Sequence, residues 1–469
     1  EPDRRAGLLM SVATDTGSIA VVPRRRRGVE LALLAFALVL GVGAYAQVDL
    51  NVDGGLGPRF EVVAAGCTIA VVVAHLAVRW RLPYADPLLL PLVVVLNGLG
   101  LAMIHRIDLI SDPVAHGARQ QLIWTGLGVA VFVAVAVALR DHRRLQRYPY
   151  TIGLVGVVLL LLPLAPGIGT TKFGARIWIQ LGPYSFQPAE AAKVLLAIAF
   201  ASYLVEKRDV LALAGYRVLG IDLPRARDLG PIVLVWLLSL AILVLQRDLG
   251  TSLLFFGLFV MMLYVATERA GWPVLGVLLF AVGAYFGYLN FGHVRVRVGA
   301  WLHPFSDFDA YYQVISAQFG LAYGGLAGTG LGLGRPGLTP LARSDFIAAA
   351  IGEELGVAGL MAVIVVYGLV VARGLRTALQ CREPFGKLLS AGLAFAFALQ
   401  VFAIIGGVTR LLPLTGLTTP FMSQGGSSMI CNWIIVGLLM VISHQVRRTV
   451  PTATEYEPDL ESTQVVRVA

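Results

Sequence analysis

The chain has 469 residues, of which 57% are hydrophobic and only 14% are charged, and its formal net charge is +9. Soluble domains carry about 25% charged residues, so the composition excludes an ordinary soluble protein and favours one embedded in lipid. The basic residues stand in short clusters between apolar runs rather than on one face, which argues against nucleic-acid binding. We therefore predict a polytopic membrane protein.

Apolar runs long enough to cross a bilayer recur from residue 29 to residue 444. A span needs roughly 20 mostly apolar residues, and backbone groups in hydrocarbon must pair within their own segment, which requires helices. We therefore predict an all-α transmembrane bundle of about 12 spans. They are 29–48, 61–78, 87–104, 121–139, 150–167, 190–205, 231–245, 250–267, 272–290, 347–372, 388–408 and 429–444.

Lys and Arg gather in alternate connections between these spans, for example at Arg24–Arg27, Arg140–Arg147 and Arg373–Lys387. Because cytoplasmic connections carry the excess of Lys and Arg, both termini are predicted to lie in the cytoplasm of a plasma-membrane protein. The longest outward connection, 291–346, is Gly-rich and too long for a simple linker, so we expect it to be functional.

The two ends of the chain and its cysteines give few further signals. Residues 1–28 are polar and Arg-rich and lack the apolar stretch of a cleavable signal peptide, so we expect a cytoplasmic tail there and another at 446–469. The three cysteines show neither CxxC spacing nor a paired framework, so we expect neither a disulfide nor a zinc site.

Glu190 and Lys193 form the first candidate site. They follow Pro188 at an expected helix start, and a spacing of three residues places them on one helix face. An ionisable side chain inside a membrane is a functional hypothesis because its burial is costly. The alternative is a structural ion pair that holds the helix in place. Arg176, in the segment GARIWI, lies in the outward connection just before them.

Asp248 forms the second candidate site, in the turn Gln246–Ser252 on the same outer side. An aspartate followed closely by Gly250 is also typical of ordinary turns. Its predicted place on the same face as Glu190 and Lys193 favours a functional role.

The outward connection 291–346 supplies Asp307 and Asp309. Either carboxylate can serve as a general base, and either can be an ordinary solvated aspartate. Gln313 follows them, and Asp345 stands just before the next predicted span. The glycines between them permit close backbone approach to a ligand, but they do not match a GxxxxGK[ST] phosphate-binding loop.

The last outward connection contains Arg410, followed by glycines and small hydroxylated residues up to Ser427 and Ser428. Such residues can cap a helix or line a cavity. The composition does not decide between these two roles.

Together these segments resemble the SEDS family (shape, elongation, division and sporulation), to which the RodA and FtsW proteins of bacterial cell-wall synthesis belong. The resemblance covers roughly residues 86–445, so 29–85 form two additional N-terminal spans. The stretch from Asp86 to Leu101 is most similar to actinobacterial RodA. The matching segments here are GARIWI, FQPAEAAK, QRDLGTS, SDFIAAAIGEELG and PLTGLTTPFMSQGGSS.

The resemblance implies a peptidoglycan glycosyltransferase that polymerises lipid II, an undecaprenyl-diphosphate-linked disaccharide pentapeptide, on the outer side of the membrane for elongation and cell shape. The family's essential aspartate aligns with Asp307, which would deprotonate the acceptor sugar hydroxyl. Arg176, Lys193 or Arg410 would stabilise the departing diphosphate. The other residues expected to bind substrate or line the cavity are Glu190, Asp248, Gln313, Asp345, Ser427 and Ser428.

The resemblance also implies a class B penicillin-binding protein as partner, beside lipid II and membrane lipids, and no nucleic acid. No cofactor is certain, and a divalent cation such as Mg²⁺ stays open. The outer segment reads HPFSDFDAYYQ and is one residue shorter than the family pattern, which leaves Asp309 as a rival to Asp307. His303, Phe308 and Gln424 also replace the residues usual in the family.

Two other functions compete with the enzyme. One is a flippase or transporter of the lipid-linked precursor, and the other is a non-catalytic scaffold for the penicillin-binding protein. A transporter places its polar residues near mid-membrane and is often built from internal repeats, whereas no repeat is visible here and few charges stand at the span centres. An outer carboxylate therefore favours the enzyme.

Overall fold

The structure is a computed structural model, and it describes residues 27–111, 116–172, 175–182, 184–207, 216–218, 221–223 and 226–448. The two predicted tails lie almost entirely outside these ranges, as does part of the predicted cytoplasmic connection at 208–230.

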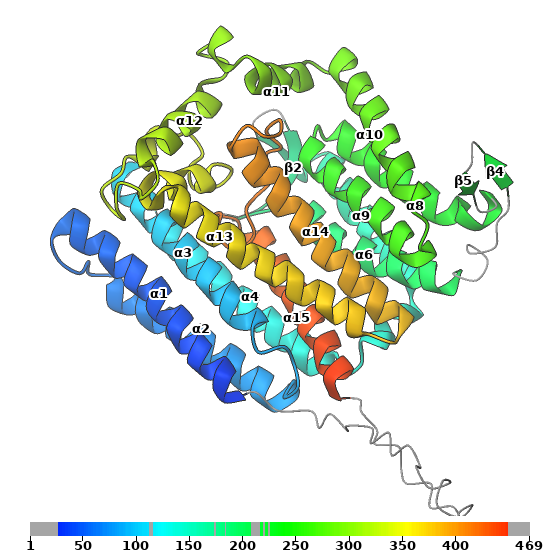
Figure 1. Ribbon diagram of the computed structural model, residues 1–469, viewed down its shortest axis with the longest axis horizontal. Helices are drawn as coiled ribbons and strands as arrows, with labels where there is room; N and C mark the ends of the chain where they lie inside the picture. The colour runs from blue at the N-terminus through cyan, green and yellow to red at the C-terminus, as the bar shows by residue number, and fades with distance from the viewer. Residues whose placement is uncertain are drawn as a thin grey trace, which may run out of the picture.

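Helices dominate the described chain, which confirms the predicted fold class (Figure 1). Among the described residues, ten helices are long and apolar enough to cross a membrane. The other two predicted spans fall on the shorter helix α5 (Pro149–Leu161) and on α8 (Ala226–Leu245), which contains the apolar stretch Val233–Leu245. The ten long helices are α1 (Arg27–Asp53), α2 (Phe60–Arg81), α3 (Leu89–Ser111), α4 (Gly117–Ala138), α6 (Pro188–Glu206), α9 (Leu249–Thr267), α10 (Gly271–Asn290), α13 (Ile347–Gln380), α14 (Pro384–Val408) and α15 (Gly426–Arg448).

The centre of the bundle is formed by α6, α14 and α15, whose side chains are mostly buried, whereas α10 presents most of its apolar side chains outward. Trp433 on α15 packs edge-on against Phe132 on α4 and Phe421, with ring centroids 5.6 Å apart in both pairs. Helices that are apolar on all sides fit a bundle surrounded by lipid.

The additional N-terminal helices α1 and α2 pack against α3 and α4 (Figure 1). Gly41 on α1 faces Gly98 on α3, and a Cβ atom added to Gly41 would lie 2.8 Å from the Gly98 Cα atom. Small residues permit such close contact between membrane helices, where van der Waals packing drives association.

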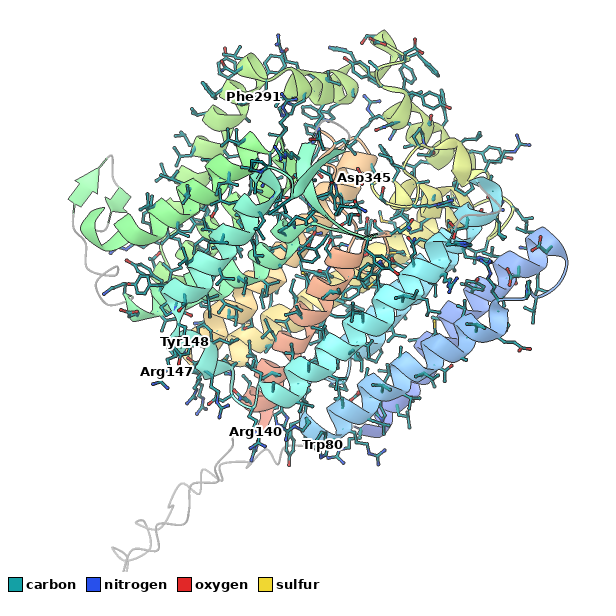
Figure 2. All side chains as sticks on the ribbon, turned by 180° about the vertical axis from the view of Figure 1, so that it is seen from behind. Trp80, Arg140, Arg147, Tyr148, Phe291 and Asp345 are labelled. Atoms are coloured by element: carbon teal, nitrogen blue, oxygen red, sulfur yellow. The ribbon has the colours of Figure 1, made fainter. Side chains whose placement is uncertain are left out.

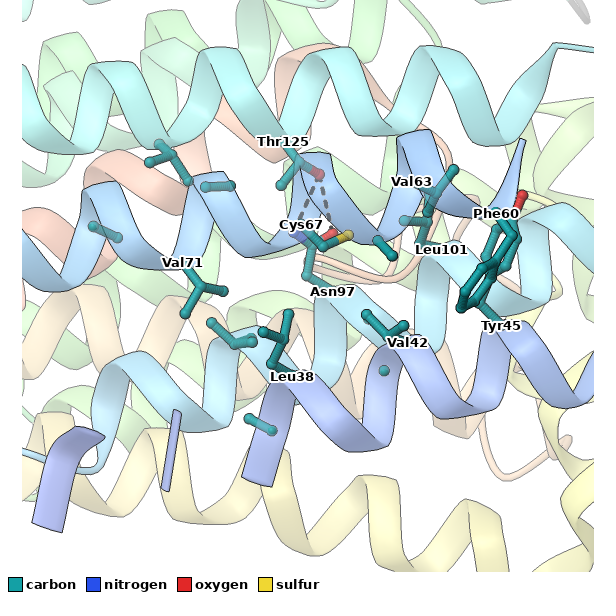
Figure 3. A pocket seen from close by; sticks show the side chains of 18 of the residues that line it. Leu38, Val42, Tyr45, Phe60, Val63, Cys67, Val71, Asn97, Leu101 and Thr125 are labelled. Atoms are coloured by element: carbon teal, nitrogen blue, oxygen red, sulfur yellow. Dashed lines mark hydrogen bonds between the residues drawn. The ribbon is translucent and has the colours of Figure 1, made fainter. Parts of the chain in front are cut away.

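An apolar groove lies between these two helices and the core (Figure 3). Leu38, Val42 and Val71 line it, and Asn97 and Thr125 at its floor exchange hydrogen bonds of 3.1 Å. No charged side chain lines this groove, so it is separate from the candidate polar site.

The basic end of the bundle carries Trp80, Arg140, Arg147 and Tyr148, opposite Phe291 and Asp345 (Figure 2). The start of α1 and the end of α15 both lie at this end (Figure 1). A buried carboxylate joins three elements there: Asp86 accepts a 2.7 Å bond from Arg373 Nε and a 2.6 Å bond from Arg447 Nη2. That this basic end is cytoplasmic stays a prediction, and the opposite end is called the outer end here on the basis of that prediction.

At the opposite, outer end, the connection 291–346 contains two helices rather than one long loop. They are α11 (Gly292–Leu302) and α12 (Tyr312–Gly324), with 3-10 turns at Pro304–Ser306 and Pro336–Leu338. In Figure 1, α11 lies crosswise at the top, between α10 and α12. The segment therefore has a defined path across the outer end of the bundle.

The outer end also holds a small antiparallel sheet of β1 (Gly169–Lys172), β2 (Ala175–Leu181) and β3 (Tyr184–Phe186). In its register, Ile179 stands opposite both Gly169 and Phe186. The sequence analysis did not predict these strands. A second hairpin, β4 (Tyr216–Val218) and β5 (Ile221–Leu223), lies elsewhere, beside the end of α8 (Figure 1).

The Gly-rich stretch before residue 335 folds over two carboxylates at the start of α13. Gly332 N donates to Glu354 Oε2 at 2.9 Å, and Arg106 Nε donates to Glu354 Oε1 at 2.8 Å. Gly328 has a φ of +86°, and a Cβ atom there would overlap the backbone carbonyl oxygen of Glu354. The glycines thus permit close approach to the backbone of α13.

Candidate functional site at the outer end

Arg176 lies on β2, where the sheet meets the turn that carries Asp248. Its backbone N–H donates to the Gln246 carbonyl oxygen at 3.3 Å, and its Nη2 donates to the Ala165 carbonyl oxygen at 3.0 Å. The side chain is half-buried. The Arg176 guanidinium therefore already donates to the Ala165 carbonyl oxygen. Its contact with a diphosphate stays a prediction.

Glu190 and Lys193 lie in the first turn of α6 and form the expected pair on one helix face. Lys193 Nζ is 2.8 Å from Glu190 Oε2, and both side chains are buried. Lys193 Nζ also donates to Gln400 Oε1 on α14 at 2.8 Å, and Gln400 Nε2 donates to the Thr418 carbonyl oxygen at 2.8 Å. The pair thus connects α6 with α14 and with the last outer connection. These contacts are those expected of an ion pair that holds the helix in place.

Asp248 both caps a helix and contributes a buried carboxylate. Its Oδ1 accepts from Thr251 N at 3.0 Å, which is an N-cap contact for α9. Its Oδ2 is buried without a hydrogen bond from any described residue. Burial raises the pKa of Asp248, while the Thr251 hydrogen bonds and the charge of Arg297 oppose that rise.

Arg297 on α11 is the cation that faces this carboxylate, and the sequence analysis did not single it out. Its Nη1 donates to the carbonyl oxygens of Thr415 at 2.8 Å and Leu414 at 3.2 Å. Burial lowers the pKa of Arg297, and the charges of Asp248 and Asp345 oppose that change. Arg297 thus interacts with two carboxylates that come from separate segments of the chain.

Asp345 completes the cluster from the start of α13. A Cβ atom added to Gly416, whose φ is +74°, would lie 3.3 Å from Arg297 Nη2 and 3.8 Å from Asp345 Oδ2. Both side chains therefore border the same glycine. Burial raises the pKa of Asp345 to about 6, against the opposing effects of the Ser344 hydrogen bond and the Arg297 charge.

Asp307, Asp309 and Gln313 lie apart from this cluster, on the exposed side of the outer end. Asp307 directly follows the 3-10 turn after α11, and its Oδ1 accepts from Ala310 N at 3.0 Å. Asp309 is exposed in the same turn. The structure shows no contact between either aspartate and the described residues of the buried cluster. The choice of Asp307 over Asp309 as the base therefore stays a prediction.

Arg410, Ser427 and Ser428 lie at the edges of the last outer connection. Arg410 Nη2 donates to the Trp301 carbonyl oxygen at 2.9 Å, and Trp301 Nε1 donates back to the Arg410 carbonyl oxygen at 3.0 Å. Ser427 and Ser428 are buried in the first turn of α15, where Ser428 Oγ accepts from Asn432 at 3.1 Å. The structure does not bring these three residues into the Asp248 cluster.

The described residues contain no group of three or more His, Cys, Asp or Glu side chains arranged to hold a metal ion. The three cysteines are free. The divalent cation considered from the sequence therefore stays a prediction.

Comparison with known proteins decides the family. The family model described as "Cell cycle protein", which covers the FtsW, RodA and SpoVE proteins, matches residues 87–448. This chain belongs to that family. It is accordingly a multi-pass membrane protein, and α1 and α2 precede the part that the family model matches.

Relatives and solved structures agree with this assignment. Peptidoglycan glycosyltransferase RodA of Mycobacterium tuberculosis is 48% identical over 444 residues, covering 92% of this chain and 94% of the relative. The probable peptidoglycan glycosyltransferase FtsW of Geobacter metallireducens is 33% identical and covers 78% of this chain and 96% of its own length.

Among solved structures, a chain of a peptidoglycan synthase complex that coordinates polymerization and crosslinking aligns with a TM-score of 0.63 and 27% identity, covering 78% of this chain and 99% of that one. The rod shape determining protein RodA of Thermus thermophilus aligns with a TM-score of 0.55 and 26% identity, covering 79% of this chain and all of that one (100%).

Proposed function

We propose that this chain polymerises lipid II into glycan strands at the outer face of the plasma membrane, for cell elongation and shape. Its class is that of its family: it is a peptidoglycan glycosyltransferase, as are its relatives at 48% identity. The substrate, the side of the membrane and the catalytic base are the parts that we propose.

The observation that carries the proposal is where the ionisable groups lie. Asp248, Arg297 and Asp345 meet at the outer end, at the start of α9, on α11 and just before α13. Glu190 and Lys193 lie in the first turn of α6, beside this group. Polar groups that converge at the end of a bundle suit chemistry on a lipid-linked substrate whose head group is in water and whose tail is in the bilayer.

The proposed reaction is a displacement at the anomeric carbon of the donor sugar. The acceptor hydroxyl oxygen attacks this carbon and forms the new glycosidic bond, while the bond to the diphosphate oxygen breaks and the diphosphate leaves with the electron pair. Asp307 accepts the proton of the acceptor hydroxyl and releases it to solvent. Its exposed position in the turn after α11 leaves the carboxylate accessible to a sugar.

The cations at the outer end suit the charge that develops on the diphosphate. Arg176, Lys193 and Arg410 all donate to protein acceptors in the described structure. A diphosphate oxygen would compete with backbone carbonyl oxygens for Arg176 and Arg410, since bonds from arginine to phosphate are stronger than those to neutral acceptors.

A class B penicillin-binding protein is the proposed partner, which would cross-link the peptides of the new strand. The relevant support is the similarity to a chain of a solved complex in which polymerization and crosslinking are coordinated. If this partner is required, the isolated chain should polymerise lipid II slowly, and its turnover should rise when the partner is added.

A reconstitution experiment separates the enzyme from the transporter. Purified chain is placed in liposomes with fluorescent lipid II, and glycan polymer and movement of lipid II between leaflets are measured in the same sample. The proposal predicts polymer, with leaflet exchange equal to that of protein-free liposomes. Exchange without polymer, with and without the partner, would favour the flippase.

A further inference from the structure

Residues 292–313, here called the outer arm, carry Asp307 and cross the outer end of the bundle on α11 (Figure 1). Given the proposed function, we infer that Arg297 is a positioning residue: it anchors the outer arm to the core and thereby fixes where the Asp307 carboxylate stands. The inference concerns the arm's attachment and assigns Arg297 no contact with the reacting atoms.

The first step is the contact between the arm and the core. Arg297 Nη1 donates to two consecutive carbonyl oxygens, of Leu414 and Thr415, in the last outer connection. That connection packs closely on Gly250 at the start of α9: a Cβ atom added to Gly250 would lie only 2.6 Å from the Thr415 carbonyl oxygen. The acceptor of Arg297 thus rests directly on the start of α9.

The second step is electrostatic. A half-buried guanidinium needs compensation, and Asp248 and Asp345 supply it from α9 and from the start of α13. Asp248 Oδ2 in turn has no hydrogen-bond donor among the described residues. Removing Arg297 would therefore leave two enclosed carboxylates without their nearest cation, and it would leave the arm without its contact to Thr415.

The third step connects Arg297 to Asp307 within the arm. Tyr311 N donates to the Asp307 carbonyl oxygen at 3.2 Å, and the Tyr311 hydroxyl packs so closely on Gly299 that a Cβ atom there would overlap it. The turn of Asp307 is thereby folded back onto α11. A displacement of α11 must move Asp307 with it.

A second contact, between Trp301 and Arg410, holds the C-terminal end of α11. Loss of Arg297 from the middle of this helix should therefore release its first part while its last turn stays bound, so that the arm pivots without detaching. A misplacement of about 1 Å in a reacting group can cost roughly 100-fold in rate, so a pivot is enough to impair a base on the arm while the substrate still binds.

The chain offers a matched control on the same helix. Arg295 is exposed and two residues from Arg297, so Arg295→Met makes the same chemical change on α11 without touching the anchor. Arg297→Met removes the anchor, and Arg297→Lys keeps the charge but not the two-carbonyl contact geometry of a guanidinium.

The arm's position is measured first, by the distance distribution between spin labels at Ala310→Cys and Gln180→Cys in a Cys67→Ala background. Both labelled positions are exposed, one on the arm and one on β2. The parent and Arg295→Met should give one narrow distribution, and Arg297→Met a broader or shifted one. An unchanged distribution in Arg297→Met overturns the anchoring role, whether or not the chain polymerises lipid II.

Kinetics then test the positioning of Asp307. Arg297→Met should lower kcat by about tenfold or more while KM changes far less, and Arg297→Lys should recover part of kcat. Parent kinetics in Arg297→Met, or a rise in KM alone, contradicts the positioning role. If the parent itself makes no polymer with its partner, the proposed function fails, and the spin-label distances still decide the anchoring.

Discussion

Arg297 on α11 donates a 2.8 Å hydrogen bond to the carbonyl oxygen of Thr415, a residue 118 positions away in the sequence. This bond attaches the segment that carries Asp307 to the connection that lies over the start of α9. The outer end is therefore built from several separate parts of the chain, and the family's motifs meet there through tertiary contacts.

The buried pair of Glu190 and Lys193 should be worth more to stability than an exposed pair. Lys193→Met leaves the Glu190 carboxylate buried without its partner and should lower the free energy of unfolding by about 3–5 kcal/mol. Glu190→Gln combined with Lys193→Met should recover part of that loss. Thermal unfolding of the purified variants measures both effects.

The control for this prediction is the pair of Lys207 and Glu206, 3.6 Å apart and 36% and 49% exposed. Lys207→Met should change stability by at most about 1 kcal/mol. Normal turnover per folded molecule in Glu190→Gln and Lys193→Met would leave the buried pair with a structural role only.

Asp345 should make stability depend on pH. Burial raises its pKa from 3.8 to about 6 in the folded protein, so the folded state binds this proton more tightly than the unfolded state does. Its contribution to stability is then fully present below the unfolded pKa and is lost as pH rises through the folded pKa. Asp345→Asn should remove this decline between those two pH values.

The measurement is the difference in thermal unfolding midpoint between Asp345→Asn and the parent at a series of pH values. This difference should grow in favour of the variant as pH rises from 3.8 to about 6, the folded pKa, and should level off above it. Asp309→Asn, an exposed change of the same kind, should leave the slope as in the parent. Parallel curves for the parent and Asp345→Asn would refute the assignment.

The contact of Gly41 and Gly98 should hold the N-terminal helices on the core. Gly98→Val places side-chain atoms where the α1 backbone now lies, so α1 and α2 should separate from α3 and the connection at 54–59 should become more susceptible to protease. Gly43→Ala on α1, where an added Cβ meets nothing within 4 Å, should behave as the parent does. Equal cleavage in Gly98→Val and the parent would show that the contact is dispensable.

Local patterns in the sequence were sufficient for the helices and for pairs of neighbouring residues. Hydropathy placed the spans, since lipid demands long apolar runs, and the three-residue spacing of Glu190 and Lys193 predicted their contact. For Asp248 the sequence left two roles open, an ordinary turn residue and a functional carboxylate. The structure agrees with both, because Oδ1 caps α9 while Oδ2 accepts no hydrogen bond from a described residue.

The rest depended on how distant segments meet. Arg297 and Gln400 donate to backbone carbonyl oxygens on the last outer connection. The local sequence pattern does not show which carbonyl oxygens these side chains will meet. Arg176 and Arg410 were expected as cations for a diphosphate, yet their backbone acceptors become visible only once β2 and α11 are placed. The strand at GARIWI was likewise missed, since strand pairing depends on partners outside the strand itself.

Asp307 is the proposed base that takes the proton of the acceptor sugar hydroxyl. The most direct test of this role is the polymerisation of purified lipid II by the chain with its penicillin-binding partner, comparing Asp307→Ala with Asp309→Ala at equal amounts of folded complex. We predict that Asp307→Ala yields no glycan polymer while Asp309→Ala yields nearly as much as the parent. Polymer at the parent level from Asp307→Ala would contradict the claim.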